Sequence, residues 1–184
     1  DSALLPLLRQ MGAEVNLSSG CITVRKGRLR ATDIDARPIP DLIPPLSVLA
    51  AAAEGESHIQ NARRLRYKES DRLQGIAELL NSLGGCLTVD GDGLLIHGVS
   101  HLQGGTVDPM GDHRLAMSAA LAALSAVAPV TVRDADCVSK SYPAFWADFQ
   151  SLKGEAPCPV SVSAAGALLY YIYIILRCRG GLCL

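Results

Sequence analysis

An internal repeat is the feature of this sequence that most constrains its fold. Apolar residues, glycines and an aspartate recur in the same order at an offset of about 71–72 residues, which is longer than the repeats of solenoid proteins. The matching positions are Leu7, Leu8, Gly12, Ile22, Asp41 and Ala50 in the first copy and Leu79, Leu80, Gly84, Leu94, Asp112 and Leu121 in the second. Each copy predicts a helix, a β-hairpin, a loop with an aspartate and a second helix. The sequence therefore predicts an α/β fold made of α+β repeats, with a chance recurrence as the alternative.

The second helix of each predicted unit is apolar on nearly all sides. Leu46–Ala53 and Leu115–Val127 are the two segments concerned, and alanine at many of their positions allows close packing. Because a helix without a polar face is a buried helix, we expect both to lie inside, covered by sheets. The hairpins are predicted from Cys21–Arg25 with Arg28–Ile34, and from Cys86–Val89 with Leu94–Val99.

Composition and charge exclude several classes of protein. The chain has 17 Lys and Arg against 18 Asp and Glu, a net charge of −1, so no basic face for a nucleic acid partner is predicted. With 49% hydrophobic and 19% charged residues, it is not an intrinsically disordered chain. The six cysteines form no pair at CxxC or zinc spacing, which favours free thiols in a reducing cytoplasm and no metal site. The opening at Asp1 without an initiator methionine indicates a segment of a longer protein.

Four polar groups stand beside the predicted helices. They are Asp33, Asp35, Arg37 and Asp41; residues 66–72; residues 111–114; and residues 139–141. Three of them come directly before a helix, where free backbone N–H groups and a positive partial charge favour anions. Arginine and lysine side chains there add contacts for a carboxylate or phosphate. We therefore expect the chain to bind a small molecule with several negative charges.

Two carboxylates within these groups, Asp41 and Glu69, are candidates for acid–base chemistry. Neighbouring cations favour the ionised form of a carboxylate and burial favours the protonated form, so carboxylates in different surroundings can divide the acid and base roles. The structural alternative is a solvated salt-bridge cluster at the start of a helix. Taken alone, His113 is equally a helix-start histidine without a task, and Lys140 a surface lysine.

Together, four strings of residues resemble the EPSP synthase family, the 3-phosphoshikimate 1-carboxyvinyltransferases. The strings are Ile39-Pro40-Asp41, Lys68-Glu69-Ser70-Asp71-Arg72-Leu73, Asp112-His113-Arg114 and Lys140-Ser141-Tyr142-Pro143, in this order. The resemblance covers residues 1–155 and is to the C-terminal part of these enzymes. It implies that this chain contains two repeat units plus part of a third. It implies an inside-out α/β barrel of the enolpyruvyl-transferase type, with buried inner helices, incomplete in this chain.

The resemblance implies an enzyme that transfers the enolpyruvyl (carboxyvinyl) group from phosphoenolpyruvate to the 5-hydroxyl of shikimate 3-phosphate, in aromatic amino acid biosynthesis. It makes Asp41 the proton acceptor and Glu69 the proton donor, with Lys140 as a proton shuttle. The substrate-binding residues would be Lys68, Arg72, His113 and Arg114. No metal or organic cofactor is implied. The family's N-terminal domain, which completes the active site, is the implied partner, so this chain alone is expected to be inactive.

Two other functions stay open: a UDP-aminosugar enolpyruvyl transferase of the same fold, and a non-catalytic fragment that binds anions. Residues 156–184 form an apolar tail outside the family pattern. Its segment Val160–Leu176 has no charged residue and is slightly shorter than the roughly 20 residues of a membrane span. A non-native continuation, an additional strand or fusion remnant, and a membrane anchor are the three interpretations of the tail. No membrane partner is expected for the enzyme itself.

Overall fold

The computed structural model describes residues 3–18, 21–25 and 28–151. The helices are α1 (Leu4–Gln10), α2 (Ile43–Ala51), α3 (Arg72–Ser82), α4 (His113–Ala123) and α5 (Phe145–Ser151), with short 3-10 helices η1 (Pro40–Leu42), η2 (Arg63–Tyr67) and η3 (Ala135–Lys140). The strands are β1 (Glu14–Ser18), β2 (Cys21–Arg25), β3 (Ile34–Asp35), β4 (Glu56–Gln60), β5 (Cys86–Asp90), β6 (Gly93–His97), β7 (Gly105–Val107) and β8 (Val130–Val132). The predicted apolar tail at 156–184 lies outside the described residues.

Local sequence signals account for where the helices begin and end. Gly12 and Gly84 follow α1 and α3 with φ of 94° and 79°, the left-handed conformation that ends a helix at low cost only for glycine. Proline occupies the first turn of α2, where no N–H donor is needed. The N-cap of α3 is Asp71, whose side chain accepts a hydrogen bond from the Gln74 N–H. Each of these helix boundaries therefore follows from a residue suited to that position.

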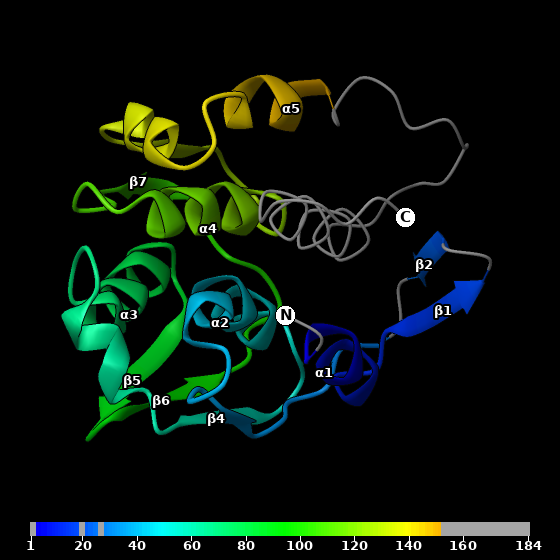
Figure 1. The fold of residues 1–184 in the computed structure, drawn as a ribbon. Coiled ribbons are helices and arrows are strands. Elements are labelled where there is room, and N and C mark those ends of the chain that lie inside the picture. The colour runs from blue at the N-terminus through cyan, green and yellow to red at the C-terminus, as the bar shows by residue number, and fades with distance from the viewer. Residues whose placement is uncertain (1–2, 19–20, 26–27, 152–184) are drawn as a thin grey trace.

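Two helices are buried on almost all sides, as their composition predicts. Every residue of α2 is buried, and so are nine of the eleven residues of α4. Both contact each other and α3, whose apolar stripe includes Leu73, Ile76 and Leu80. In Figure 1 the sheet that contains β4, β6 and β5 lies on one side of α2 and α3, and α4 lies on the other. The apolar core is thus formed mainly between helices, with sheets outside.

Two of the three sheets cover these helices, and the third lies beside α1. The largest has the strand order β3-β4-β6-β5, with β3 parallel to β4 and the remaining neighbours antiparallel. A second sheet pairs β7 with β8 in parallel, and a third pairs β1 with β2. The predicted hairpin at residues 86–99 is confirmed, with Leu87 opposite Ile96.

The prediction of the first hairpin is wrong about one of its two strands. Strand β2 does pair in a hairpin, but with Glu14–Ser18 rather than with residues 28–34. That later segment runs along the core instead, since Leu29, Thr32 and Ile34 are buried and Arg30 forms a single parallel bridge to Glu54. The alternation of Val15 and Leu17 with polar residues, typical of a strand, is the signal that identifies the true partner. The predicted turn at Lys26-Gly27 lies outside the described residues.

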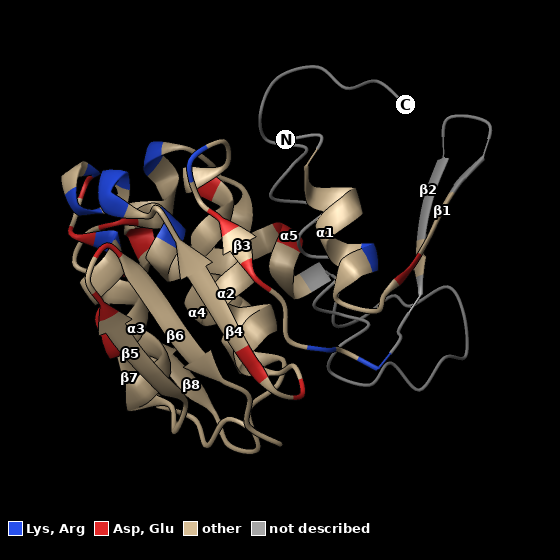
Figure 2. Cartoon of the chain, turned by 90° about the horizontal axis from the view of Figure 1, so that it is seen from below, with Lys and Arg blue, Asp and Glu red and all other residues tan. Residues whose placement is uncertain are grey.

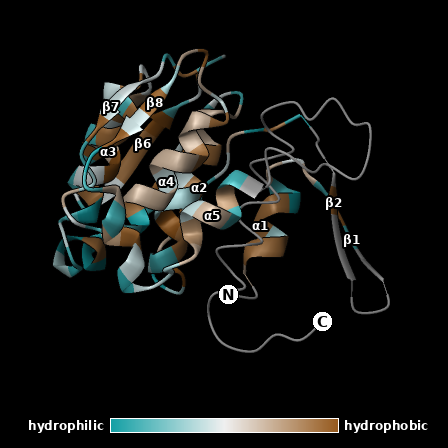
Figure 3. Cartoon of the chain, turned by 90° about the horizontal axis from the view of Figure 1, so that it is seen from above, coloured by the Kyte–Doolittle hydropathy of each residue, from teal (hydrophilic) through white to brown (hydrophobic). Residues whose placement is uncertain are grey.

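Charged and apolar residues are segregated along the molecule. Figure 2 shows most Lys and Arg at one end of the helical layer, with others on α1 and on the segment that leads to β3, and Figure 3 shows much of the hydrophilic colour at that same end. Helix and strand surfaces that face one another are mostly hydrophobic. Over the ranges the structure describes, no helix has both the length and the apolar character needed to cross a membrane. The charged end is therefore where a polar ligand is to be sought.

Candidate active site

Helix starts bring the predicted polar residues to one place. Asp41 lies in η1 directly before α2, Arg72 is the first residue of α3, and His113 is the first residue of α4. The start of α4 is held by Asp112, whose Oδ1 accepts a hydrogen bond from the Arg114 N–H at 2.9 Å. The bonds of Arg72 to Asp41 and to Asp112 join the N-terminal ends of α2, α3 and α4.

Arg72 is the centre of the cluster. Its side chain is only 2% exposed, and its guanidinium donates to three carboxylates from three segments. Nε lies 2.7 Å from Asp112 Oδ2, Nη1 lies 3.0 Å from Asp41 Oδ1, and Nη2 contacts Glu69. The planar, permanently charged guanidinium suits this fork-like arrangement, which a lysine cannot reproduce.

The buried pair of Arg72 and Asp112 is held in its charged form. Burial by itself would raise the pKa of Asp112, but the hydrogen bond and charge of Arg72 outweigh it, and the pKa of Asp112 is lowered. Burial would likewise lower the pKa of Arg72, yet its hydrogen bond to Asp112 and the neighbouring carboxylates raise that pKa. Ser70 completes the pair by donating its hydroxyl to Asp112 Oδ2 at 3.1 Å.

Asp41 is surrounded by cations. Its Oδ1 lies 3.3 Å from Lys68 Nζ, 3.0 Å from Arg72 Nη1 and 3.6 Å from Arg114 Nε. Arg114 also donates from Nη1 to the Asp41 backbone carbonyl at 3.2 Å. The Asp41 side chain is 20% exposed, so a ligand can reach it from solvent. Three cations around one partly exposed carboxylate form a site suited to an anion that also presents a hydroxyl group.

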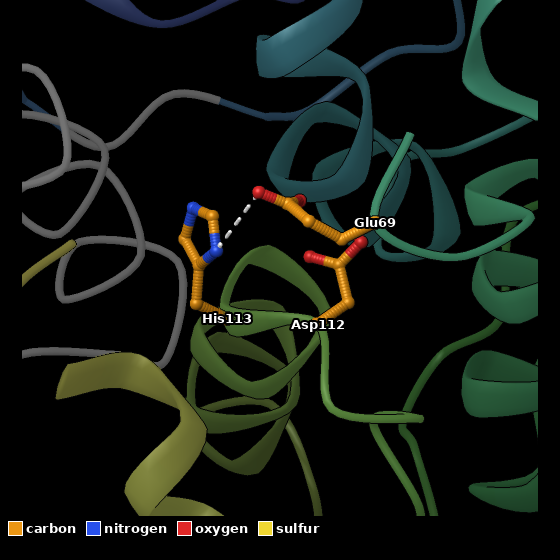
Figure 4. Close-up of side chains that lie close together, drawn as sticks. All are labelled: Glu69, Asp112 and His113. Carbon is orange, nitrogen blue, oxygen red and sulfur yellow. Dashed lines mark ion pairs between the residues drawn. The ribbon is translucent and has the colours of Figure 1, made fainter. Parts of the chain in front are cut away.

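Figure 4 shows the Glu69 carboxylate and the His113 ring facing each other, with the Asp112 carboxylate beside them. His113 Nδ1 is 3.5 Å from Glu69 Oε1, an ion-pair distance, and this buried atom makes no hydrogen bond within the described residues. Burial lowers the pKa of His113, which favours the neutral imidazole. Glu69 is 45% exposed. Its carboxyl group therefore combines a fixed contact to Arg72 with access to a bound ligand.

Glu69, Asp112 and His113 also come close enough together to resemble a metal site. One potential ligand atom from each lies within 4.8 Å of the other two. Arg72, however, donates to both Glu69 and Asp112, and so already supplies positive charge between the two carboxylates. The positive charge of the guanidinium would repel a divalent cation there, so we assign the three residues to an ion-pair network.

Lys140 lies beside this network without a contact to its carboxylates in the described residues. It is exposed at the end of η3, and its Nζ donates to the Gly111 carbonyl at 3.0 Å. That contact joins η3 to the loop that precedes His113 and Arg114. The structure thus brings six of the seven predicted site residues into one network, Asp41, Lys68, Glu69, Arg72, His113 and Arg114, and places Lys140 next to it.

Sequence reasoning missed two residues of the network. The sequence marks Asp112 only as the repeated aspartate and as part of a polar group before a helix, whereas in the structure it is the fully buried counter-ion of Arg72. Ser70 was expected only as part of a charged string, but it bonds to that same carboxylate. Their positions inside the Lys-Glu-Ser-Asp-Arg and Asp-His-Arg strings were the available signal.

The fold and this network define an α/β domain of the enolpyruvyl-transferase type. The chain superposes on the EPSP synthase of Acinetobacter baumannii with a TM-score of 0.70 and 29% identity, covering 82% of this chain and 38% of that one. A family model for EPSP synthase (3-phosphoshikimate 1-carboxyvinyltransferase) matches residues 1–149. The chain belongs to the EPSP synthase family.

Two relatives named 3-phosphoshikimate 1-carboxyvinyltransferase extend this result. The chain is 45% identical over 155 residues to the one from Clostridium acetobutylicum, and 47% identical over 154 residues to the one from Methanocella arvoryzae. These alignments cover 84% and 83% of this chain. The chain spans only 36% of the length of either relative.

Proposed function

We propose that this chain is the C-terminal portion of an enzyme that transfers the carboxyvinyl group of phosphoenolpyruvate to the 5-hydroxyl of shikimate 3-phosphate. The observation that carries the proposal is the network around Arg72 and Asp41, formed from the starts of three helices. Both substrates carry several negative charges, and the network presents two partly exposed cations, Lys68 and Arg114, beside the buried Arg72. Family membership supports the same reaction.

The network suggests a division of roles among its residues. Lys68 and Arg114, the partly exposed cations, bind the phosphate and carboxylate groups directly, with His113 as a supporting hydrogen-bond donor. Arg72, whose guanidinium is buried among three carboxylates, can contact the substrate only where one of those carboxylates gives way. Asp41 accepts the proton of the 5-hydroxyl as its oxygen adds to the enol carbon. Glu69, at the exposed edge, protonates the methylene carbon. Lys140 lies close enough to the loop before α4 to serve the phosphoenolpyruvate side as a proton shuttle.

The reaction then proceeds through acid–base steps alone. Addition gives a tetrahedral intermediate with a methyl group; the Glu69 carboxylate then takes a proton back from that methyl group as inorganic phosphate leaves, which forms the enol ether. A positioned proton donor or acceptor contributes about 10²–10⁴-fold to the rate. Cations that stabilise developing charge in a water-poor site contribute a comparable or larger factor. No metal or organic cofactor is required.

Strand registers support the proposal that residues 1–155 contain two repeated units and part of a third. Parallel pairing joins Ile34 to Ile59 in the first half and Thr106 to Thr131 in the second, each position about 72 residues further on. The single bridges Arg30–Glu54 and Leu102–Ala126 keep the same offset. We propose that these units belong to an inside-out α/β barrel that an additional segment completes, and that residues 156–184 lie outside it.

The proposed reaction needs the other part of the enzyme. Because the chain spans about a third of its relatives, we propose that an N-terminal domain supplies the remaining substrate contacts. A cytoplasmic location fits the free thiols of Cys86 and Cys137. The 184-residue chain alone is expected to release no phosphate from the two substrates.

A chimera tests the proposal. Residues 1–155 of this chain would replace the matching segment of the Clostridium acetobutylicum relative, and phosphate release would be measured with phosphoenolpyruvate and shikimate 3-phosphate. We expect turnover in the chimera and none in the isolated chain. A chimera with the circular dichroism spectrum of the parent and normal shikimate 3-phosphate binding, but no turnover, would contradict the proposal. Turnover with a UDP-aminosugar as acceptor in place of shikimate 3-phosphate would favour the alternative transferase.

A further inference from the structure

The segment between η2 and α3 carries three residues of the Arg72 network but has no regular secondary structure of its own. Lys68, Glu69 and Ser70 follow Tyr67, the last residue of η2, and precede the N-cap of α3. Neither a helix nor a strand ladder fixes their backbone. Whatever holds this segment therefore decides where Glu69, the proposed proton donor, lies.

Arg66 closes the base of the segment. Its Nη1 donates to Asp71 Oδ2 at 3.1 Å, so an ion pair joins the two residues on either side of residues 67–70. The other oxygen of the same carboxylate, Asp71 Oδ1, accepts the Gln74 N–H and caps α3. The carboxylate is thereby held from both sides, and it bridges η2 to the start of α3.

The same guanidinium anchors the closed segment to the sheet. Arg66 Nη2 donates to the Gly91 carbonyl at 2.8 Å, and Nε lies 3.7 Å from Asp92 Oδ1. Both of these residues belong to the turn between β5 and β6. The Arg66 side chain is 31% exposed, so its contacts are partly shielded from water. Three nitrogens directed at three groups use the forked shape of arginine, which the single nitrogen of lysine cannot reproduce.

The far end of the segment is fixed at Ser70. Its hydroxyl donates to Asp112 at 3.1 Å, which joins this end to the start of α4. Glu69, directly before Ser70, has a side chain that is 45% exposed. Because an exposed side chain changes rotamer readily, the Glu69 carboxylate is directed at a bound substrate only if the backbone beneath it is held in place.

We propose that Arg66 is a positioning residue for the transferase, which closes and anchors the segment so that Lys68 and Glu69 are in place before the substrate binds. The inference rests on the proposed function. Within the described residues, the polar contacts of Arg66 are to Asp71 and the β5–β6 turn, so it acts through the segment and not on the substrate. A misplacement of about 1 Å in an active site can cost about 10²-fold in rate.

Limited proteolysis of the 184-residue chain tests the anchoring without any turnover. A glutamate-specific protease cuts after Glu69 when the segment opens, and after Glu78 when α3 unfolds. Loss of the charged hydrogen bonds in Arg66→Gln should speed the cut after Glu69 by about tenfold or more, and the cut after Glu78 by less than about twofold. Peptide mass mapping measures both rates.

The matched control is Arg63→Gln, at an exposed arginine of the same 3-10 helix, which should change neither rate. Equal acceleration of both cuts in Arg66→Gln, or no acceleration after Glu69, would overturn the proposal. Equal acceleration would show that the variant loosens the whole fold and not this segment.

Kinetics of the chimera with the Clostridium acetobutylicum relative test the consequence for catalysis. Arg66→Gln should lower kcat by about tenfold or more while KM for phosphoenolpyruvate changes little. Arg66→Lys should lose less, because it keeps the charge beside Asp71 but not the fork. Asp71→Asn keeps a cap oxygen and weakens the ion pair, so Arg66→Gln combined with Asp71→Asn should lose no more than the larger single loss.

Near-normal kcat in Arg66→Gln would overturn the positioning role, and so would fully additive losses in the double variant. An unmutated chimera without turnover contradicts the proposed function instead. In that case the cleavage rates after Glu69 and Glu78 alone decide whether Arg66 anchors the segment.

Discussion

Replacing Asp112 by alanine should be among the most destabilising changes in this chain. The substitution leaves the Arg72 guanidinium, only 2% exposed, without its principal counter-ion, which is itself 0% exposed. Removing one partner of a buried pair costs about 3–5 kcal/mol, and the remaining contacts of Arg72 to Asp41 and Glu69 favour the lower end. Loss of the α4 N-cap adds about 1 kcal/mol. We therefore expect the free energy of unfolding to fall by about 4 kcal/mol.

Urea denaturation, followed by circular dichroism and by the fluorescence of the single tryptophan, Trp146, measures this change. Asp112→Asn keeps a cap oxygen but removes the charge, so it should lose about 3 kcal/mol, from the ion pair alone. Asp33→Ala, at an exposed carboxylate, is the control and should stay within about 0.5 kcal/mol of wild type. A loss below about 1 kcal/mol in Asp112→Ala would refute the idea that the buried pair organises the helix starts.

Three further predictions concern acid stability, backbone space and thiol reactivity. Because the pKa of Asp112 is lowered in the folded state, its ionised carboxylate stabilises the fold above the unfolded carboxyl pKa of about 3.9. This stability is lost as the pH falls through the folded-state pKa, so acid titration should destabilise Asp112→Asn less than wild type. Gly98→Ala, whose methyl group would overlap a backbone carbonyl oxygen, should lower the free energy of unfolding measured in urea by more than about 2 kcal/mol. Gly91→Ala, which has open space around it but a positive φ, is the control and should lower it by about 1 kcal/mol. Iodoacetamide, with peptide mass mapping, should label exposed Cys86 before Cys137, because burial raises the pKa of the Cys137 thiol.

Local features of this fold could be predicted because they depend on neighbouring residues. The cap at Asp71, the glycine that follows α1 and the prolines that open α2 each act within one helical turn. The two buried helices were also predictable, since their composition leaves no polar face. These features set the positions of the helix starts, and with them the general place of the charged residues.

Features that depend on distant partners could not be predicted. Strand β2 has strand-like segments on both sides, and the sequence does not say which one it joins. Asp112 and Arg72 are 40 residues apart, so their pairing follows only from the packing of α3 against α4. Lys140 illustrates the same limit, because its contact to Gly111 depends on where η3 crosses α4. The catalytic and binding roles of the site residues stay predictions until they are tested.

Turnover of the chimera after Glu69→Gln tests the central claim most directly, namely that this network forms half of an enolpyruvyl transferase active site. Loss of a proton donor should lower kcat by about 100-fold or more while KM for phosphoenolpyruvate changes little. Glu78→Gln, at an exposed position on α3, is the matched control and should behave as the unmutated chimera. Near-normal kcat in Glu69→Gln would contradict the account.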